Sequence, residues 1–310
     1  MPHQPDHRLD PRTGPGARGS RAFWRGPVLY IISLSSIPSR FADLPRVLAA
    51  LLAQHRPPAE VRLYLPRRYR RFPDYDGALP DVPKGVEVIR VPDDLGPATK
   101  ALYAARDLRG QAVDLLYCDD DRIYTPGWAG LLLADRAAHP GAALCLQGFH
   151  LRHIGLPAVT QPAPRMRRGR GRRDPAYRLQ RAWQALRWGG AGRVPPALRA
   201  RPRSFARSGF ADIAEGLSGV AIRPDFLDDA AFDIPPVLWA VDDVWLSGQM
   251  MRAGHPVWLH ATRSRFSIDL PSQRGPEALH RQVIEAADRD AANRACVAHL
   301  QRAYGIWRAG

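Results

Sequence analysis

Three consecutive aspartates, residues 119–121, follow directly on an apolar run, and their type and spacing could support metal chemistry. The run 113–118 predicts a buried strand, whose core cannot hold carboxylates. Side chains two residues apart in an extended backbone point the same way, so Asp119 and Asp121 can face one ligand while Asp120 turns aside. Two convergent carboxylates suit Mg²⁺ or Mn²⁺, whose other ligands are often phosphate oxygens. These aspartates, called here the aspartate triplet, predict a metal site that meets a phosphate-bearing substrate.

The aspartate triplet also has a simpler interpretation, because Asp is favoured in turns and at helix N-caps. Three neighbouring carboxylates repel one another unless a cation lies among them, and this favours the metal hypothesis. The sequence Thr-Pro-Gly at 125–127 predicts a turn into a helix. The triplet would then lie in a strand-to-helix loop, where open α/β sheets bind their ligands.

Cationic residues follow two other predicted strands. A loop of small residues, 33–40, carries the single cation Arg40. A later loop runs from Asp94 through Gly-Pro-Ala-Thr to Lys100, where a helix starts. The backbone N–H groups of that helix start and the Lys100 ammonium could bind an anion. In the simpler alternative, Asp94 caps the helix and Lys100 is solvated.

Further candidates lie in the second half of the chain. Gly216 and Gly219 would let the backbone approach a ligand closely, or they mark an ordinary bulge. Asp242 and Asp243 fall in the first turn of a predicted helix, where carboxylates complement the helix dipole and need no other role. His260 ends a short predicted strand, and a lone histidine is more often structural than a ligand.

Predicted strands and helices alternate along the chain. Continuous apolar runs suit central parallel strands, and a strand, helix, strand unit forms a right-handed crossover. This order predicts an α/β fold with a mostly parallel central sheet flanked by helices. The predicted strands are 28–32, 61–65, 86–91, 113–118, 142–151 and 256–260, and the predicted helices are 41–54, 101–108, 237–254 and 276–302.

The composition is that of a globular protein: 310 residues, 45% hydrophobic and 24% charged. No run approaches the roughly 18 apolar residues of a membrane span. The segment 1–26 is polar and rich in Pro, Gly and Arg, which predicts a disordered tail without a secretory signal. Cys118, Cys145 and Cys296 are far apart, which predicts buried reduced thiols in a cytoplasmic protein.

The formal net charge of +15 indicates an anionic partner, and arginines concentrate in 161–207. In this arginine-rich segment, a predicted helix at 175–188 has Leu179, Trp183 and Leu186 on one face and arginines around them. Such a helix can lie on an anionic membrane surface. Alternatively, the segment is a loop or lid whose helix packs its apolar face on the body of the protein. No RNA- or DNA-binding module is recognisable around it, so a nucleic-acid partner is not expected.

Taken in order, the Gly-Pro-Ala-Thr-Lys loop, the aspartate triplet, the glycine pair, the Asp-Asp helix start and the strand-ending histidine resemble the GT-A fold glycosyltransferases, especially the bacterial family 2 type. The resemblance covers residues 27–265. It implies a GT-A domain over 27–270, with a Rossmann-like nucleotide-binding half, an acceptor half and the arginine-rich segment as an insertion. Residues 271–310 would be a C-terminal helical extension.

The same resemblance implies roles for individual residues. Residues 118–121 look like the family's DXD motif, in which Asp119 and Asp121 would bind the metal and His260 would complete its site. Asp243, at the position of the family's Glu-Asp motif, would be the general base of an inverting transfer. Many family members carry an acidic contact to the nucleotide base where this chain has Leu-Pro-Arg-Arg at 65–68, so the base is left open. The residues implied to border the nucleotide-sugar are Arg40, Asp94, Lys100, Asp119, Asp120 and Gly219.

The resulting prediction is a cytoplasmic enzyme that uses Mn²⁺ or Mg²⁺ to move a sugar from a nucleoside diphosphate sugar to the hydroxyl of a surface glycan or lipid-linked saccharide. It could also contact the anionic inner face of a membrane peripherally. Two alternatives stay open: a nucleotidyltransferase or other metal-dependent phosphoryl-group enzyme, and a non-catalytic module that binds anionic surfaces. The absence of a Gly-rich loop with Lys before Ser or Thr argues against a P-loop enzyme. The sugar, the nucleotide and the oligomeric state are left open by the sequence.

Overall fold

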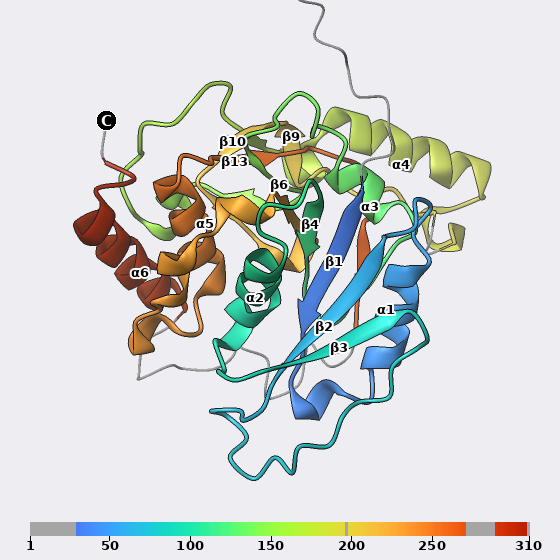
Figure 1. Ribbon diagram of the computed structural model, residues 1–310. Helices are drawn as coiled ribbons and strands as arrows, with labels where there is room; N and C mark the ends of the chain where they lie inside the picture. Colours follow the sequence, from blue (N-terminus) through green and yellow to red (C-terminus); the bar gives the residue numbers. More distant parts are fainter. Residues whose placement is uncertain (1–28, 196–197, 271–288, 309–310) are drawn as a thin grey trace, which may run out of the picture.

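An eight-stranded sheet runs through the computed structural model, which describes residues 29–195, 198–270 and 289–308 (Figure 1). Its strands, in spatial order, are β10 (Gly209–Ala211), β13 (Val257–Leu259), β6 (Ala143–Cys145), β12 (Val220–Ile222), β4 (Asp114–Tyr117), β1 (Tyr30–Ser35), β2 (Glu60–Pro66) and β3 (Val86–Val91). The half from β4 to β3 is parallel throughout. In the other half β12 is antiparallel to both neighbours, β13 is parallel to β6, and β10 forms an antiparallel edge. The predicted α/β fold with a mostly parallel central sheet is confirmed.

Helices cover both faces of the sheet. On one face α1 and α3 pack against the strands, and on the other α2 and α5 do so, with α6 packed on α5. In Figure 1, α4 lies apart from these layers, along the outer edge of the molecule. The helices are α1 (Leu44–Leu52), α2 (Thr99–Asp107), α3 (Trp128–Leu132), α4 (Pro175–Arg187), α5 (Asp242–Arg252) and α6 (Arg289–Tyr304).

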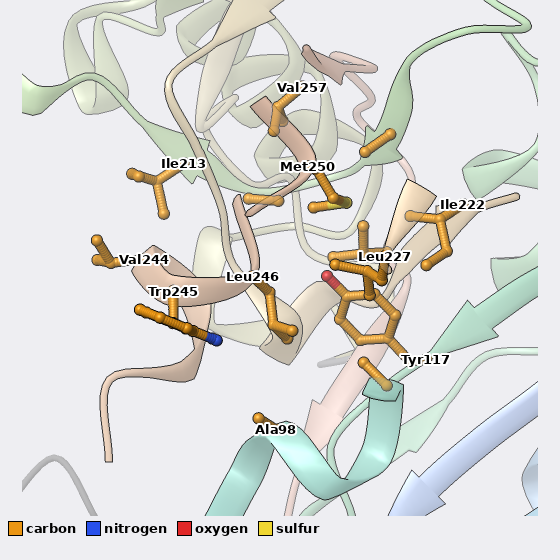
Figure 2. Close-up of a cluster of buried hydrophobic side chains, with 14 of the residues drawn as sticks. Ala98, Tyr117, Ile213, Ile222, Leu227, Val244, Trp245, Leu246, Met250 and Val257 are labelled. Carbon is orange, nitrogen blue, oxygen red and sulfur yellow. The ribbon is translucent and has the colours of Figure 1, made fainter. Parts of the chain in front are cut away.

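The alternation of side chains along the strands builds two hydrophobic cores. On β4, Leu116 contributes to the core beneath α1 and α3, whereas Leu115 and Tyr117 contribute to the core beneath α2, α5 and α6. Figure 2 shows part of this second core, in which Trp245 and Met250 of α5 gather with Tyr117. The continuous apolar runs of the sequence are therefore explained by burial of both faces of the central strands.

The strand predicted at 142–151 is wrong as a single element. It divides into β6 and β7 (Gly148–Phe149), and β7 leaves the main sheet to pair antiparallel with β11 (Ile213–Ala214). The close approach needs glycine, because a Cβ on Gly148 would lie 2.3 Å from the carbonyl oxygen of Ile213. This small ribbon carries the chain towards the site described below.

The aspartate triplet is followed by a short strand before the next helix. β5 (Arg122–Tyr124) pairs antiparallel with β14 (Ser267–Asp269), and an ion pair of 2.8 Å between Arg122 and Asp269 joins the two strands. The predicted helix after 125–127 is confirmed as α3. The predicted direct connection from strand to helix is wrong, because pairing with β14 draws the chain into β5 first.

Prolines set the starts of two predicted helices. The helix predicted at 41–54 begins at Leu44 as α1, with Pro45 in its first turn, where the missing N–H is tolerated. The helix predicted at 237–254 begins only at Asp242, because a 3₁₀ turn, Pro236–Leu238, precedes it. Asp242 and Asp243 therefore lie in the first turn of α5, as the sequence predicts.

The C-terminal helix belongs to the main body. α6 packs on α5, and its Cys296, Val297 and Leu300 are buried in the same core. The division of the chain at residue 270 stays a prediction. The predicted disordered tail, 1–26, and the first part of the predicted helix, 276–288, lie outside the described residues. The three cysteines are buried and unpaired, as predicted.

The arginine-rich segment presents the apolar face of α4 to solvent. Asp174 caps the helix by accepting the N–H of Ala176 at 2.9 Å. The exposed fractions are 74% for Leu179, 58% for Trp183 and 84% for Leu186. The alternative in which this face packs on the body is therefore wrong. None of the helices that the structure describes is long and apolar enough to cross a membrane.

Candidate active site

A cavity of about 560 Å³ lies at the carboxyl ends of the parallel strands. The segments that follow β1, β3 and β4 line it with Ser36, Asp94 and the aspartate triplet. Asp242 and Asp243 join them from the start of α5. Open α/β sheets bind ligands at this edge because several strand ends meet there. The predicted site residues that line the cavity are Arg40, Asp94, Lys100, Asp119, Asp120, Asp121 and Asp243.

Lys100 joins the aspartate triplet to α5. Its Nζ lies 2.5 Å from Oδ1 of Asp119 and 2.8 Å from Oδ2 of Asp242, and the side chain is buried. Burial disfavours the ammonium, but Asp119, Asp242 and Asp243 outweigh it and hold the pKa of Lys100 well above its usual value. Burial also works against the Asp119 carboxylate, yet Lys100 lowers the pKa of Asp119. The alternative of a solvated Lys100 is therefore wrong.

Arg40 fixes the rest of the triplet. Its Nη1 lies 2.5 Å from Oδ1 of Asp120 and 3.4 Å from Oδ2 of Asp121. The hydroxyl of Ser36 donates to Oδ2 of Asp120 at 2.5 Å. Asp120 is only 5% exposed, against 28% for Asp119 and 15% for Asp121. Asp120 thus anchors the loop, while its two neighbours keep more surface open to the cavity.

Asp243 is held beside Lys100 by the backbone of a neighbouring loop. Its Oδ1 accepts the N–H of Gly216 at 2.8 Å, and its Oδ2 lies 3.6 Å from Nη2 of Arg289. Burial, and then the charge of Asp242, raise the pKa of Asp243 to about 8. A carboxyl group with this pKa gains and loses its proton near neutral pH, which suits proton transfer.

The two candidate glycines have different neighbours. A Cβ on Gly216 would lie 2.8 Å from Nζ of Lys100 and 3.1 Å from Oδ1 of Asp243, so this glycine lets the loop approach both side chains. Gly219 has a φ of +78°, and a Cβ there would lie 2.3 Å from the ring of Trp128. Gly219 packs on Trp128 and does not line the cavity. Gly216 does not line the cavity either, but it is the glycine that approaches the charged side chains of the site. The contact of Gly219 with the nucleotide-sugar stays a prediction.

Asp94 lines the cavity, but its hydrogen bonds stabilise the loop that carries it. Its Oδ1 accepts the N–H of Gly96 at 2.9 Å, and its Oδ2 accepts the N–H of Arg70 at 2.8 Å. These bonds tie the loop after β3 to the loop after β2. No side chain caps α2, so the simpler alternative in which Asp94 caps that helix is wrong.

His260 lies away from the aspartate triplet. It follows β13, three strands from β4, which corresponds to about 14 Å across the sheet. Its Nδ1 lies 2.9 Å from Oδ2 of Asp135, which also accepts the indole N–H of Trp258. The predicted metal role of His260 is therefore wrong, because the antiparallel β12 and β6 separate it from the triplet.

Aromatic side chains form a wall of the cavity that the sequence did not reveal. Tyr69 and Phe72 lie in the connection after β2, and Trp239 precedes α5. Trp239 is fixed because its indole N–H donates to the carbonyl of Asp94 at 3.0 Å. Only the tyrosine and arginine content of the connection hinted at a role, since aromatic residues far apart in sequence show no common pattern. Such faces can stack on a planar ring.

A second set of missed residues adds charge to another part of the cavity wall. Glu215, Arg168 and Arg289 line it, from the ends of β11, β8 (Arg167–Arg168) and α6. Burial raises the pKa of Glu215, and Arg168 and Arg289 oppose that shift. These residues come from three distant parts of the chain, so no local spacing could have identified them.

The carboxylates could bind a divalent cation whose remaining ligands would be phosphate oxygens. Within the described ranges, no group of three or more His, Cys, Asp or Glu side chains is arranged to hold a metal by itself. Asp119 and Asp120 already have the ammonium of Lys100 and the guanidinium of Arg40 against them. Mg²⁺ is often bound by only one or two carboxylates together with substrate phosphates. Oxygen donors at Asp119 and Asp121 suit that arrangement.

The comparisons with known proteins concern the fold. The structure is similar to that of TarS 1–349 from S. aureus in complex with UDP, at 10% identity and a TM-score of 0.39, covering 88% of this chain and 70% of that one. It is also similar to glucosyl-3-phosphoglycerate synthase from Mycobacterium tuberculosis in complex with Mg²⁺ and UDP, at 14% identity and a TM-score of 0.44, covering 92% and 82%. No family model matches the sequence, and no curated protein matches it.

Proposed function

We propose that this chain transfers a glycosyl group from a nucleoside diphosphate sugar to an acceptor hydroxyl, with a divalent cation. The observation that carries the proposal is one cavity that combines the aspartate triplet, the two cations paired with it and the titratable carboxyl of Asp243. The resemblance of the sequence motifs to GT-A glycosyltransferases supports the same reaction. The acceptor in this proposal is a glycan or a lipid-linked saccharide.

Arg40 and Lys100 would offset the charge of the leaving diphosphate. Both are held near the triplet by ion pairs of 2.5 Å, and the pKa of each is raised because carboxylates outweigh burial. Fixed cations stabilise a transition state in which negative charge develops on the phosphate oxygens. A bound Mg²⁺ or Mn²⁺ would supply Lewis-acid stabilisation of the same charge. Tyr69 and Phe72 offer apolar faces to the nucleotide base.

Asp243 would act as the general base of an inverting transfer. The acceptor oxygen bonds to the anomeric carbon, and the bond from that carbon to the phosphate oxygen breaks. The electron pair of the broken bond leaves with the nucleoside diphosphate, and the hydroxyl proton passes to Asp243. The N–H of Gly216 fixes one oxygen of this carboxylate at 2.8 Å, so its geometry is set before the acceptor binds.

The test begins with ligand-induced stabilisation. Thermal unfolding of the full chain is followed with a panel of nucleoside diphosphates and their sugars, with and without Mn²⁺. We expect one nucleotide to raise Tm in a metal-dependent way. Asp121→Asn should remove the metal-dependent part of that rise. Asp74→Asn, an exposed aspartate outside the cavity, is the matched control and should leave it unchanged.

The products of the reaction separate the alternatives. With the donor identified, glycosyl transfer releases a nucleoside diphosphate. A nucleotidyltransferase would instead consume a nucleoside triphosphate and release pyrophosphate, and that result would overturn the proposal. A chain that binds no nucleotide and turns over no donor would support the non-catalytic alternative. Full metal-dependent turnover by a folded Asp121→Asn variant would contradict the role given to the triplet.

A further inference from the structure

Three of the exposed large apolar side chains that the structure describes lie together on the outward face of α4, away from the cavity. Leu179, Trp183 and Leu186 follow one another at helical spacing, so their side chains form a single stripe. All three are exposed, whereas Tyr177 of the same helix is buried. A stripe of two leucines and a tryptophan in water is unfavourable by itself, which indicates that something covers it.

Arginines border this stripe on both sides. Helical geometry places Arg178 along one edge and Arg187 along the other, and both are exposed. The guanidinium of Arg187 lies 5.5 Å from the ring centroid of Trp183, so the charge sits directly beside the apolar surface. This is the arrangement of a helix that lies in a polar–apolar interface, with arginines reaching outward to anions.

A groove of about 680 Å³ extends the basic surface beside α4. Leu179 and Trp183 form part of its lining, and the rest includes Arg199, Arg201, Arg263 and Arg265. None of the described residues that line it is acidic. Guanidinium groups bind phosphate oxygens with paired hydrogen bonds, so the groove is complementary to a phosphate headgroup.

We propose that α4 and this groove dock the protein on an anionic phospholipid bilayer. The stripe of Leu179, Trp183 and Leu186 would enter the headgroup and acyl-chain boundary. Arg178, Arg187 and the arginines of the groove would bind lipid phosphates. This inference concerns binding alone, so it does not depend on the proposed glycosyl transfer.

The charge pattern favours a bilayer over other occupants. A second copy would bring the same arginines face to face across a symmetric interface, and like charges there repel. A single-stranded nucleic acid stacks its bases on aromatic rings. Two of the three stripe residues, Leu179 and Leu186, are aliphatic and offer no such ring. An anionic bilayer satisfies both the leucines and the arginines.

The experiment is co-sedimentation of the full chain with vesicles. Phosphatidylcholine vesicles are compared with vesicles that also contain phosphatidylglycerol. We expect binding only to the anionic vesicles. Leu179→Ser with Leu186→Ser should weaken that binding at least about tenfold, because two exposed leucines lose their apolar burial. The control, Leu79→Ser with Val237→Ser, removes two apolar side chains elsewhere that are 55% and 56% exposed, and should bind as the parent does.

A second pair of variants separates α4 from the general charge of the chain. Arg178→Ala with Arg187→Ala should weaken binding and reduce its salt dependence. Arg46→Ala with Arg302→Ala removes the same net charge from exposed positions on α1 and α6 and should have a smaller effect. Equal losses from the two pairs would overturn the proposal, because any basic surface would then suffice.

The other occupants are outcomes of the same set of variants. Absence of parent binding to anionic vesicles would overturn the proposal. A dimer in light scattering that the Leu179→Ser, Leu186→Ser variant loses would assign the stripe to a second copy instead. Binding of a single-stranded oligonucleotide that this variant loses, with vesicle binding intact, would assign it to nucleic acid. Since none of these measurements requires turnover, failure here and failure of the proposed reaction are distinguishable.

Discussion

Cationic side chains beside the aspartate triplet of the cavity are largely buried and paired with carboxylates, whereas on α4 they are exposed. In the cavity, Lys100 and Arg40 are largely buried and lie 2.5 Å from carboxylates. On α4, Arg178 and Arg187 are exposed and border an apolar stripe that is exposed as well. A buried charge must be paired for the fold to persist, so the cavity's ion pairs are partly a requirement of folding. An exposed arginine needs no partner for folding. Its position beside exposed leucine and tryptophan is therefore explained by the proposed bilayer partner and not by the fold.

The largest expected effect concerns the base assigned to the cavity. Asp243→Asn should lower the rate of glycosyl transfer by about 10²- to 10⁴-fold, because an amide cannot accept the acceptor proton. The parent's kcat/KM should rise about tenfold per pH unit and level off above about pH 8. The direction follows from the pKa of Asp243, which burial raises to about 8, since only the deprotonated carboxylate is a base.

Two measurements would break that assignment. Donor-induced thermal stabilisation should survive in Asp243→Asn, because the donor's charge is met by Arg40 and Lys100 instead. A rate that is independent of pH between about 6 and 8 would contradict the role of Asp243. An unchanged rate in a folded Asp243→Asn variant would do the same.

The next effect compares a buried cation with an exposed one. Lys100→Met should lower the free energy of unfolding by about 3–5 kcal/mol, because it leaves Asp119 and Asp242 without their shared partner in a buried position. Arg178→Met should change it by no more than about 0.5 kcal/mol, because the side chain is exposed. Urea denaturation of both variants measures the contrast. Similar losses of unfolding free energy in the two variants would contradict the difference between the paired charges of the cavity and the exposed charges of α4.

The smallest expected effect is that of truncating an exposed leucine, which we compare with truncating a buried one. Leu48→Ala in α1 removes a fully buried side chain and should lower the free energy of unfolding by about 2–5 kcal/mol. Leu186→Ala in α4, where the side chain is 84% exposed, should change it by less than about 0.5 kcal/mol. A large loss from Leu186→Ala would mean that the stripe packs on the body, and would remove the basis for bilayer docking.

The parts of the site that the sequence predicts follow from the physics of parallel strands. Arg40, Lys100 and the aspartate triplet come after strands β1, β3 and β4, and parallel strands bring their carboxyl ends to one edge. Apolar runs identified β1 and β4, because both of their faces are buried, and alternation identified the edge strand β3. Local pattern was therefore enough to gather most of the charged residues in one place.

The sequence fails to place site residues where strand order or side-chain packing determines their positions. His260 also follows a strand whose end lies at the same edge, but β6 and β12 stand between it and the triplet, and no local pattern reveals that order. Gly216 and Gly219 are indistinguishable by spacing, and only the placement of Trp128 and Lys100 separates them. The aromatic wall of Tyr69 and Trp239 is assembled from distant loops, so composition alone could not place it.

The short connection between the cavity and α4 limits the distance between the two. Arg168 lines the cavity, and α4 begins at Pro175, so seven residue steps separate them. Even fully extended, these steps span at most about 25 Å. A bilayer under the start of α4 would therefore lie within the length of a short oligosaccharide from the cavity wall. A lipid-linked acceptor could then stay embedded by its tail while its sugar end is modified, and would not have to leave the bilayer between successive additions.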